Sequence, residues 1–248
     1  MKIVIKNKRN LNLAAVIHKT EGNGRFPAII LLQGFTGYKD EKHIKSLAED
    51  LADKGFVAVR FDASGFAESE GTIDNDFRFS NYVDDLGCVH VYLKKQKYVD
   101  GNRIGLWGHS MGPMVGITYA SRRDDVKAFC AVAPAVKLGT NDLLGELSAE
   151  WEKSGFYEKT SSNKAIGCIR IPYAFLKDAQ NYDMRKYIKK IYSSMLFVVG
   201  SKDEATLPNN SNLLFKYANE QKQISKYRVW DTSTKKTRSG FVKLMIFQ

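Results

Sequence analysis

The hydrophobic positions of this 248-residue chain follow two periods, one typical of strands and one typical of helices. Near the start, KIVIK and LNLAAVIH alternate apolar and polar residues, which predicts an antiparallel pair of strands joined near residues 7–10. Further along, unbroken apolar runs predict strands that are buried on both faces of a sheet. These runs are PAIILLQG, FVAVRFD, RIGLWG, KAFCAVAPA and SMLFVVGS.

Segments with helical spacing separate these strands. A first helix is expected from Asp40 to Gly55, because apolar residues recur there at spacings of three and four. A second is expected from about Asp76 to Gln96, and GPMVGITYA predicts a third. Strands that alternate with helices predict an α/β fold with a mostly parallel sheet and right-handed connections.

One long segment does not fit this alternation. Val136 and Ile191 are separated by more than fifty residues, although a crossover helix needs only about a dozen. We therefore expect a core formed by 1–136 and 191–248, and a cap formed by 137–190 over the strand ends, where it lines a pocket. The alternative is that the aromatic residues of the segment only pack its own helices. These residues are Trp151, Phe156, Tyr157, Tyr173 and Phe175.

The pentapeptide GHSMG lies between a predicted strand and a predicted helix. Gly108 and Gly112 allow a sharp turn there and let the strand and the helix approach closely. Ser110 then lies at the apex of the turn with its hydroxyl exposed. This context predicts that Ser110 is the nucleophile of an acyl-transfer enzyme.

Acyl transfer also requires hydrogen-bond donors for the oxyanion and a carboxylate that orients the base. We expect the donors to be the backbone N–H groups of Met111, which follows the serine, and of Phe35, in the loop QGFTG. Asp203, just past the strand LFVVG, is the expected acid. The alternatives are a plain glycine turn at QGFTG and a turn or capping role for Asp203.

Four motifs occur in the order seen in a known family: QGFTGYKD, FDASGFAESEG, GHSMGP and VVGSKDEATLP. On these motifs the chain resembles the α/β-hydrolase superfamily over about residues 25–225, and most closely bacterial cinnamoyl (feruloyl) esterases and serine-aminopeptidase-like hydrolases. The resemblance implies an α/β-hydrolase fold with an eight-stranded sheet and an inserted cap after the sixth strand. It also implies a serine carboxylesterase, acting through an acyl-enzyme on a small-molecule ester, with no metal and no cofactor.

The chain departs from the family pattern at several positions. Gln33 stands where the family usually has histidine, and Ala67 lies in a turn that usually has the form G-H-G-x-S. Ser194 stands where the strand before the acid usually starts with proline. From about residue 231 the sequence is atypical, because basic residues are no longer mixed with acidic ones. We expect a truncated or frame-altered end, or a loss of catalysis.

The largest departure is the absence of a catalytic histidine. The family places it after the last strand, which corresponds to KYRVW at 226–230, but DTSTKK follows there and contains none. The only histidines are His18, His43, His90 and His109.

None of the four fits the role of base. His90 lies on an apolar helix stripe, His109 is adjacent to the nucleophile, and His18 ends an early strand. His43 is the nearest candidate, but we expect no histidine within hydrogen-bonding reach of Ser110. A lysine such as Lys235 could act as the base chemically, since Ser–Lys variants of the triad exist, but nothing in the sequence supports that role.

Two alternatives to the esterase therefore stay open. One is a catalytically impaired hydrolase that binds an ester-like or acyl ligand under its cap. The other is a peptidase or acyl hydrolase of the same fold.

The composition adds limits on partners and location. The net charge is +11, but lysines alternate with acids, as in EKHIKSLAEDLADK, and no basic–aromatic cluster predicts a nucleic-acid partner. The longest apolar run, PAIILL, is too short to span a membrane. MKIVIKNKRN lacks the apolar stretch of a signal peptide. A homodimer is left open.

The three cysteines are Cys88, Cys130 and Cys168, each among apolar neighbours. We expect buried free thiols rather than disulfides or a metal site. Together with the lack of a signal peptide, this predicts a cytoplasmic location.

Overall fold

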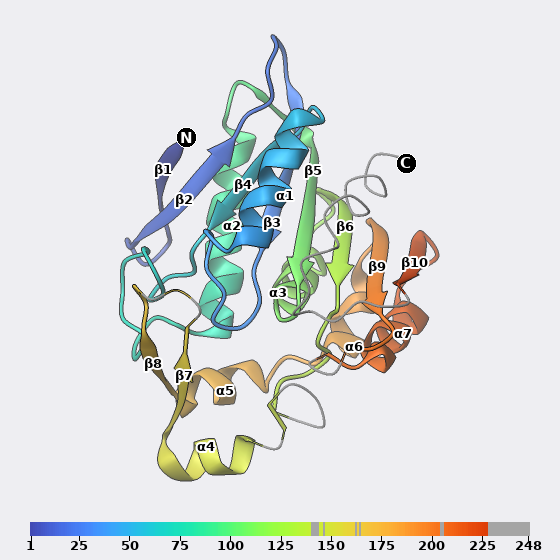
Figure 1. Cartoon of the computed structure of the whole chain (residues 1–248). Coiled ribbons are helices and arrows are strands. Elements are labelled where there is room, and N and C mark those ends of the chain that lie inside the picture. The colour runs from blue at the N-terminus through green and yellow to red at the C-terminus, as the bar shows by residue number, and fades with distance from the viewer. Residues whose placement is uncertain (140–143, 146, 162, 164, 204–205, 228–248) are drawn as a thin grey trace.

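The computed structural model describes residues 1–139, 144, 145, 147–161, 163, 165–203 and 206–227, and it centres on an eight-stranded sheet (Figure 1). The strand order is β1-β2-β4-β3-β5-β6-β9-β10. The β1–β2 and β2–β4 pairs are antiparallel, and all the other pairs of this sheet are parallel. The bounds are β1 Lys2–Lys6, β2 Asn12–His18, β3 Phe26–Leu32, β4 Val57–Phe61, β5 Val99–His109, β6 Val126–Val132, β9 Ser194–Gly200 and β10 Lys222–Tyr227.

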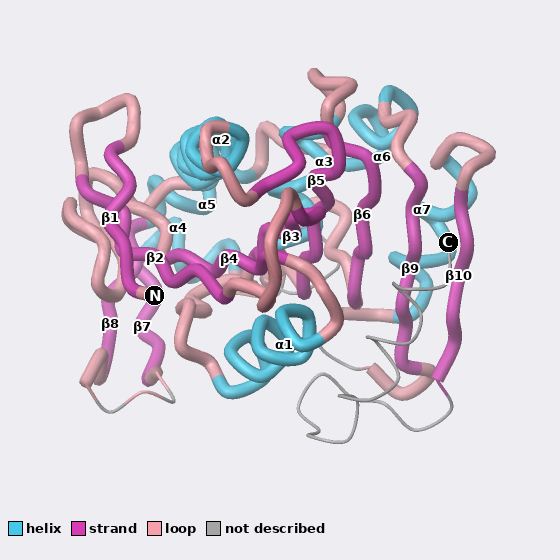
Figure 2. The backbone as a smooth tube through the Cα atoms, turned by 90° about the horizontal axis from the view of Figure 1, so that it is seen from above, coloured by secondary structure: helices cyan, strands magenta, loops and turns pink. Residues whose placement is uncertain are grey.

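Helices cover both faces of the sheet (Figure 2). Helix α1 (Lys42–Asp53) covers one face, and α2 (Phe79–Lys94), α3 (Gly112–Ala120) and α6 (Met184–Tyr187) cover the other. Helix α7 (Pro208–Tyr217) packs against β9, β10 and α6. This is the predicted architecture, a mostly parallel sheet flanked by helices.

The burial of the helices follows their hydrophobic patterns. Four apolar residues of α1 are buried against the sheet, and Gly55, with φ of 88°, follows the end of the helix. In α3 every residue is buried, because this helix lies between the sheet and the neighbouring helices α2 and α6. The nucleophile turn predicted just before α3 is therefore followed by a fully buried helix.

The long segment after β6 contains elements that periodicity did not predict. It forms α4 (Ser148–Ser154), an antiparallel pair made of β7 (Phe156–Thr160) and β8 (Cys168–Pro172), and α5 (Tyr173–Ala179). In Figure 1 these elements lie beyond the end of the sheet toward which β5 and β6 point. The end of the segment, α6 and the short helix η1 (Ile188–Lys190), instead packs against α3 and α7, next to the sheet.

The structure corrects three local expectations. Helix α2 begins at Phe79 rather than near Asp76, because Asp76 accepts a hydrogen bond from the backbone of Thr72 in a turn. The last strand begins at Lys222, and residues 228–230 of the predicted strand lie outside the described residues, as do Thr234 and Lys235. The helix α7 lies on a stretch for which no helix was predicted.

The cysteines are free, as expected, but they are not all buried. Cys130 is buried in β6, Cys88 is half-buried and Cys168 is exposed. Cys168 lies in β8, where buried and exposed residues alternate and its side chain is on the outer face. Its apolar sequence neighbours therefore point the other way.

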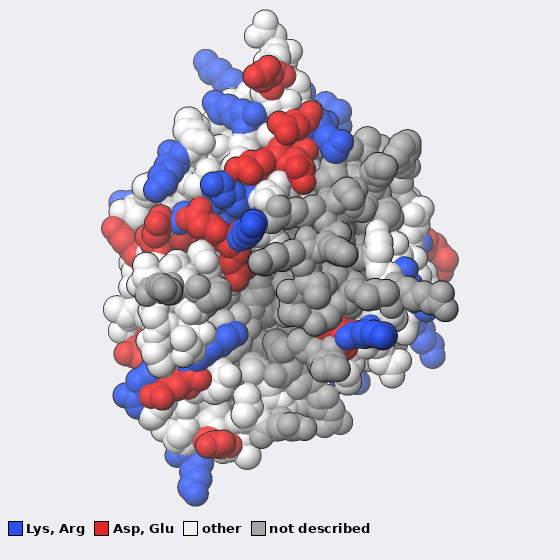
Figure 3. All heavy atoms as spheres, viewed as in Figure 1, with Lys and Arg blue, Asp and Glu red and all other residues white. Residues whose placement is uncertain are grey.

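On the face shown in Figure 3, basic and acidic side chains are interspersed rather than separated into patches. No helix within the described ranges is both long enough and apolar enough to cross a membrane.

Candidate active site

Ser110 lies on a tight turn between β5 and α3. Its backbone φ is 60°, a value that residues other than glycine rarely adopt. The turn is held on both sides, because the Ser110 N–H donates to Val132 O at 3.0 Å and the Ala135 N–H donates to Ser110 O at 3.1 Å. A strained residue held in this way presents its side chain in one fixed direction.

The two glycines of GHSMG are required by close backbone approaches. A Cβ on Gly112 would lie 2.3 Å from the carbonyl oxygen of Leu32, and one on Gly108 would lie 2.7 Å from the carbonyl carbon of Gly112. Both distances are far below van der Waals contact. The motif therefore brings the start of α3 against the end of β3, where the next loop begins.

That loop, which follows β3, brings Gly34 against the serine. A Cβ on Gly34 would lie 3.1 Å from Ser110 Cβ and 3.5 Å from Ser110 Oγ. A hydrogen bond from Gly37 N–H to Gly34 O closes a turn in which Thr36 has a φ of 60°. Within the described residues, the N–H groups of Phe35 and Met111 donate no hydrogen bond, so both stay available to an oxyanion.

An ionic network around the buried Lys39 and Asp62 anchors the far end of the same loop. Lys39 is 2% exposed, and its ammonium pairs with Asp62 at 3.0 Å, Glu68 at 2.7 Å and Asp40 at 3.0 Å. Burial by itself lowers the pKa of Lys39, but the hydrogen bond to Glu68 and the charge of Asp62 outweigh it and hold the pKa above its usual value. The Lys39 N–H also donates to Asp62 Oδ1 at 2.6 Å. The loop is thus fixed to the turn after β4.

Gln33, which stands where the family pattern has histidine, makes hydrogen bonds at the start of the same loop. Its side-chain amide donates to Phe61 O at 2.6 Å, and its backbone N–H donates to the Tyr82 hydroxyl at 3.1 Å. The glutamine at this position therefore links the end of β3 to the end of β4.

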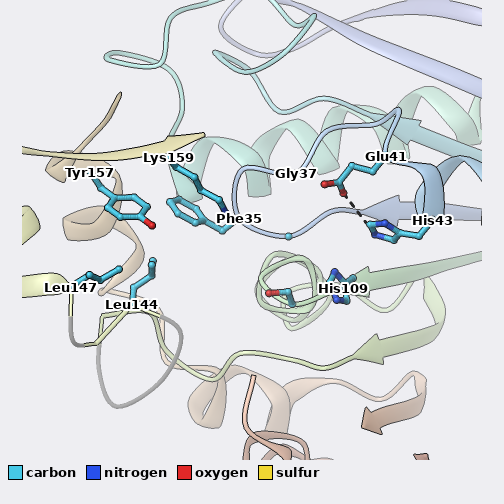
Figure 4. A pocket seen from close by; sticks show the side chains of 11 residues that line it. Phe35, Gly37, Glu41, His43, His109, Leu144, Leu147, Tyr157 and Lys159 are labelled. Atoms are coloured by element: carbon cyan, nitrogen blue, oxygen red, sulfur yellow. Dashed lines mark ion pairs between the residues drawn. The ribbon is translucent and has the colours of Figure 1, made fainter. Parts of the chain in front are cut away.

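The serine faces a cavity of about 340 Å³, a size typical of small-molecule sites (Figure 4). The cavity is bounded by the Ser110 turn, the loop after β3 and the segment after β6. The lining residues are Gly34, Phe35, Gly37, Glu41, His43, His109, Ser110, Leu144, Leu147, Tyr157 and Lys159.

Phe35 joins the loop to the inserted segment through aromatic contacts. Its ring centroid lies 5.1 Å from that of Phe175, 6.0 Å from that of Trp151 and 6.5 Å from that of Tyr157. Trp151 is buried and donates its indole N–H to Ile171 O at 2.9 Å. The buried aromatic residues of the segment therefore pack both within the segment and onto the loop that carries the Phe35 amide.

Two of the four histidines lie away from the cavity and have other partners. His18 Nε2 accepts a hydrogen bond from Arg60 Nε at 3.0 Å, and burial and the charge of Arg60 lower its pKa to about 4. His90 is fully buried and pairs through Nδ1 with the Tyr119 hydroxyl at 2.8 Å. Burial lowers its pKa to about 4. His90 is thus a core residue, as its helical position indicated, with a hydrogen-bond partner at Nδ1 and none at Nε2 among the described residues.

The other two histidines line the cavity without bonding to the serine. The rings of His43 and His109 lie 5.4 Å apart, edge to face. His43 Nε2 lies 3.7 Å from Glu41 Oε2, and burial lowers the pKa of His109 to about 3, so His109 is neutral. All four histidines of the chain are among the described residues, and none of them hydrogen-bonds to Ser110 Oγ.

Asp203 lies in the turn after β9, where it is 2% exposed. Its Oδ1 accepts a hydrogen bond from the backbone N–H of Thr206 at 2.9 Å, which is a turn contact. It is not among the described residues that line the cavity. Its role as the acid that orients a base stays a prediction. Across the described ranges, no group of three or more His, Cys, Asp or Glu side chains could hold a metal ion.

Glu41 and Lys159 are the charged cavity residues that the sequence patterns did not indicate. Burial raises the pKa of the Glu41 carboxyl to about 7, and the positive charge of Lys159 opposes that rise. Glu41 precedes α1 and Lys159 lies in β7, so more than a hundred residues separate them. No local pattern relates two positions so far apart.

Comparisons with known proteins identify the family and the fold. A family model described as the alpha/beta hydrolase fold matches residues 27–166, more than half of the chain. An uncharacterised 31.7 kDa protein from the traX–finO intergenic region of Escherichia coli is 24% identical over 247 residues, covering 86% of this chain and 85% of that protein. The mitochondrial palmitoyl-protein thioesterase ABHD10 of Pongo abelii is 29% identical over 163 residues, covering 64% of this chain and 51% of that protein.

Solved structures show the same fold. Est1E from Butyrivibrio proteoclasticus, in a structure with ferulic acid bound, superposes with a TM-score of 0.78 at 20% identity, covering 98% of this chain and 95% of that one. At this identity the likeness supports the fold and not the substrate.

Proposed function

This chain belongs to the α/β-hydrolase family, and from that membership we propose that it hydrolyses carboxylic esters through an acyl-enzyme formed on Ser110. The observation that carries the proposal is the position of Ser110. It lies on a positive-φ turn, at a cavity of about 340 Å³, next to a loop whose Phe35 N–H is not used in a hydrogen bond among the described residues.

The proposed reaction has two steps. Ser110 Oγ attacks the ester carbonyl while the N–H groups of Phe35 and Met111 donate to the developing oxyanion, and the alcohol leaves with a proton. Water then attacks the acyl-enzyme, releases the acid and returns the proton to Ser110. Phe35 and Tyr157 line the cavity, which favours acyl groups with an aromatic or apolar body, including hydroxycinnamoyl groups.

A second candidate function is supported by the surroundings of the hydroxyl. No histidine of the chain, all four being described, hydrogen-bonds to Ser110 Oγ, and a serine without a base is a weak nucleophile at neutral pH. Loss of the triad histidine costs on the order of 10⁶ in kcat in the best-studied case, while the oxyanion hole and binding still give about 10³–10⁴ over water. The alternative is therefore a protein that binds an ester or acyl ligand without turning it over.

The experiment compares the wild type, Ser110→Ala and Ser46→Ala on para-nitrophenyl butanoate. Ser46 lies on α1 outside the cavity and serves as the matched control. The hydrolase proposal predicts that Ser110→Ala lowers kcat/KM by at least about 10³-fold and that Ser46→Ala leaves kcat/KM unchanged. We also expect a fluorophosphonate to label the peptide that contains Ser110. Equal rates for wild type and Ser110→Ala would reject the hydrolase and favour the binding protein.

A further inference from the structure

Lys159 reaches the cavity because of strand alternation in β7. Residues two apart on a strand share a face, so Tyr157 and Lys159 both line the cavity, whereas Glu158 points outward and pairs with Arg170 at 3.5 Å. In Figure 4 the side chains of Tyr157 and Lys159 extend from the strand toward Phe35. The lysine is therefore placed over the ligand space rather than on the solvent side of the insertion.

The Lys159 ammonium has no anionic partner within the described part of the chain. It makes no ion pair within 4.0 Å and no hydrogen bond there, and its nearest described aromatic contact is the Phe35 ring, with the nitrogen 5.5 Å from the centroid. Burial lowers the pKa of Lys159, and the charge of Glu41 acts in the opposite direction. A partly buried ammonium with three free donors is costly unless an acceptor satisfies it.

Glu41 lines the same cavity but does not form an ion pair with the Lys159 ammonium. It is the cavity carboxylate, yet it forms its close contact with His43, at 3.7 Å, and not with Lys159. Its raised pKa, about 7, also leaves it only partly ionised at neutral pH. Three other described lining residues are apolar: Phe35, Leu144 and Leu147. The cavity thus combines a cationic group that can bind an anion with an apolar surface.

We propose that Lys159 is a specificity-determining residue that binds a carboxylate carried by the substrate, so that the cavity selects esters with a second, ionised carboxyl group. The reaction of this substrate rests on the proposed ester hydrolysis, whereas the binding of its carboxylate by Lys159 does not depend on that proposal. The apolar wall contacts the carbon chain that joins the ester to the carboxylate. Lys159 takes no part in bond making.

The kinetic test uses pairs of esters that differ only in the carboxylate. On the acyl side, the para-nitrophenyl half-ester of adipic acid is compared with para-nitrophenyl hexanoate. On the alcohol side, para-(hexanoyloxy)benzoate is compared with its methyl ester. The variants are Lys159→Met, which keeps the aliphatic stem, and Lys153→Met, an exposed lysine on α4, as the matched control.

We expect Lys159→Met to lower kcat/KM for the carboxylate-bearing ester of one pair by about 10- to 100-fold, the range of a charge-assisted hydrogen bond, and that of its neutral partner by less than about 3-fold. Lys153→Met should change neither. Which pair responds identifies the side of the ester that carries the carboxylate. An equal loss on charged and neutral esters would show that Lys159 acts on hydrolysis of every ester, and this would overturn the inference. No loss on any ester would overturn it as well.

A binding measurement separates this inference from the hydrolase proposal. Adipic acid monoanilide and hexananilide are amides that resist hydrolysis, and calorimetry gives their affinity for Ser110→Ala with and without Lys159→Met. A Lys159-dependent preference for the monoanilide supports the inference even if the wild type hydrolyses no ester. The alcohol side is probed in the same way with para-(hexanoylamino)benzoate and its methyl ester. Equal affinities within both pairs, or a preference that survives Lys159→Met, would reject the inference even if Ser110-dependent hydrolysis is found.

Discussion

Ser110 and Ala67 share a backbone conformation that favours glycine, with φ of 60° and 52°. At Ser110 the strain presents a hydroxyl to the cavity. At Ala67 the side chain is exposed and lies where the related family has a glycine, so its methyl group gains little from packing. The left-handed conformation costs alanine roughly 1–2 kcal/mol, and glycine avoids this cost. Part of the resulting gain in stability is lost, because glycine also has greater conformational freedom in the unfolded chain.

Ala67→Gly should therefore raise the free energy of unfolding by about 0.5–1 kcal/mol. Urea unfolding followed by circular dichroism checks this value. Ala52→Gly, inside helix α1, is the control and should lower stability by about 0.5–1 kcal/mol, because glycine is unfavourable within a helix. A loss of stability at Ala67 would contradict the strain argument.

Glu41 makes the stability of the protein depend on pH. Its folded pKa is about 7, above the ordinary value of 4.5, chiefly because of burial. Between these values the folded state binds the proton more strongly than the unfolded state. The contribution of Glu41 is therefore fully present below about pH 4.5 and is lost as the pH rises through 7.

Glu41→Gln should remove this dependence, since glutamine stays neutral. Relative to the wild type, the variant should gain up to about 3 kcal/mol in unfolding free energy between pH 4.5 and pH 8. Urea titrations at both pH values measure the difference. Glu49→Gln, at a half-exposed position on α1, should run parallel to the wild type. A parallel curve for Glu41→Gln as well would show that this carboxyl titrates normally.

At the scale of elements, the junction of β5 with α3 depends on the absence of one side chain. Gly112→Ala would place a Cβ 2.3 Å from Leu32 O, which only a backbone shift can relieve. At Gly87, inside α2, the added Cβ would meet only the tip of the Tyr119 ring, at 3.3 Å. The same substitution therefore has opposite expected effects at the two sites.

Gly112→Ala should lower the free energy of unfolding by about 3 kcal/mol or more and displace Ser110. Gly87→Ala should be neutral or stabilising by up to about 1 kcal/mol, because alanine favours a helix more than glycine does. Thermal and urea unfolding of both variants provide the measurement. Similar losses at both positions would show that the close approach at Leu32 is not what requires glycine.

The loop after β3 is a second element whose position depends on its neighbours. It lacks regular secondary structure, yet Lys39 fixes one end to Asp62, and Phe35 packs against Trp151 and Phe175 of the inserted segment. The position of the Phe35 amide is therefore coupled to the packing of the insertion. A change in the insertion can therefore move the predicted oxyanion donor, the Phe35 N–H, without touching Ser110.

Across the whole molecule, the site depends on the strand order. Strand β5 ends at the Ser110 turn and pairs with β3, which ends at the loop that carries Phe35, although more than sixty residues separate the two strands in sequence. Both are parallel strands, so their carboxyl ends meet at the same edge of the sheet. The insertion that follows β6 closes the cavity from that edge.

Much of this arrangement follows from local patterns in the chain. Alternating and unbroken apolar segments located seven strands of the main sheet within a few residues, and helical spacing located α1, α2 and α3, because burial on one or both faces of an element leaves a periodic trace. The last strand, β10, begins four residues before the segment expected for it. GHSMG between a strand and a helix indicated the Ser110 turn, since the turn depends on glycines only a few residues apart. The roles of Ser110, Asp203, Phe35 and Met111 stay predictions.

Other features arise from contacts between distant segments, which leave no periodic trace. The hairpin of β7 and β8, the exposed side chain of Cys168 and the meeting of Glu41 with Lys159 in one cavity are of this kind. Their burial and charge environment depend on where the insertion lies relative to the sheet. Local sequence determines which face of an element is apolar, whereas long-range packing determines which charged groups share a cavity and how far their pKa values shift.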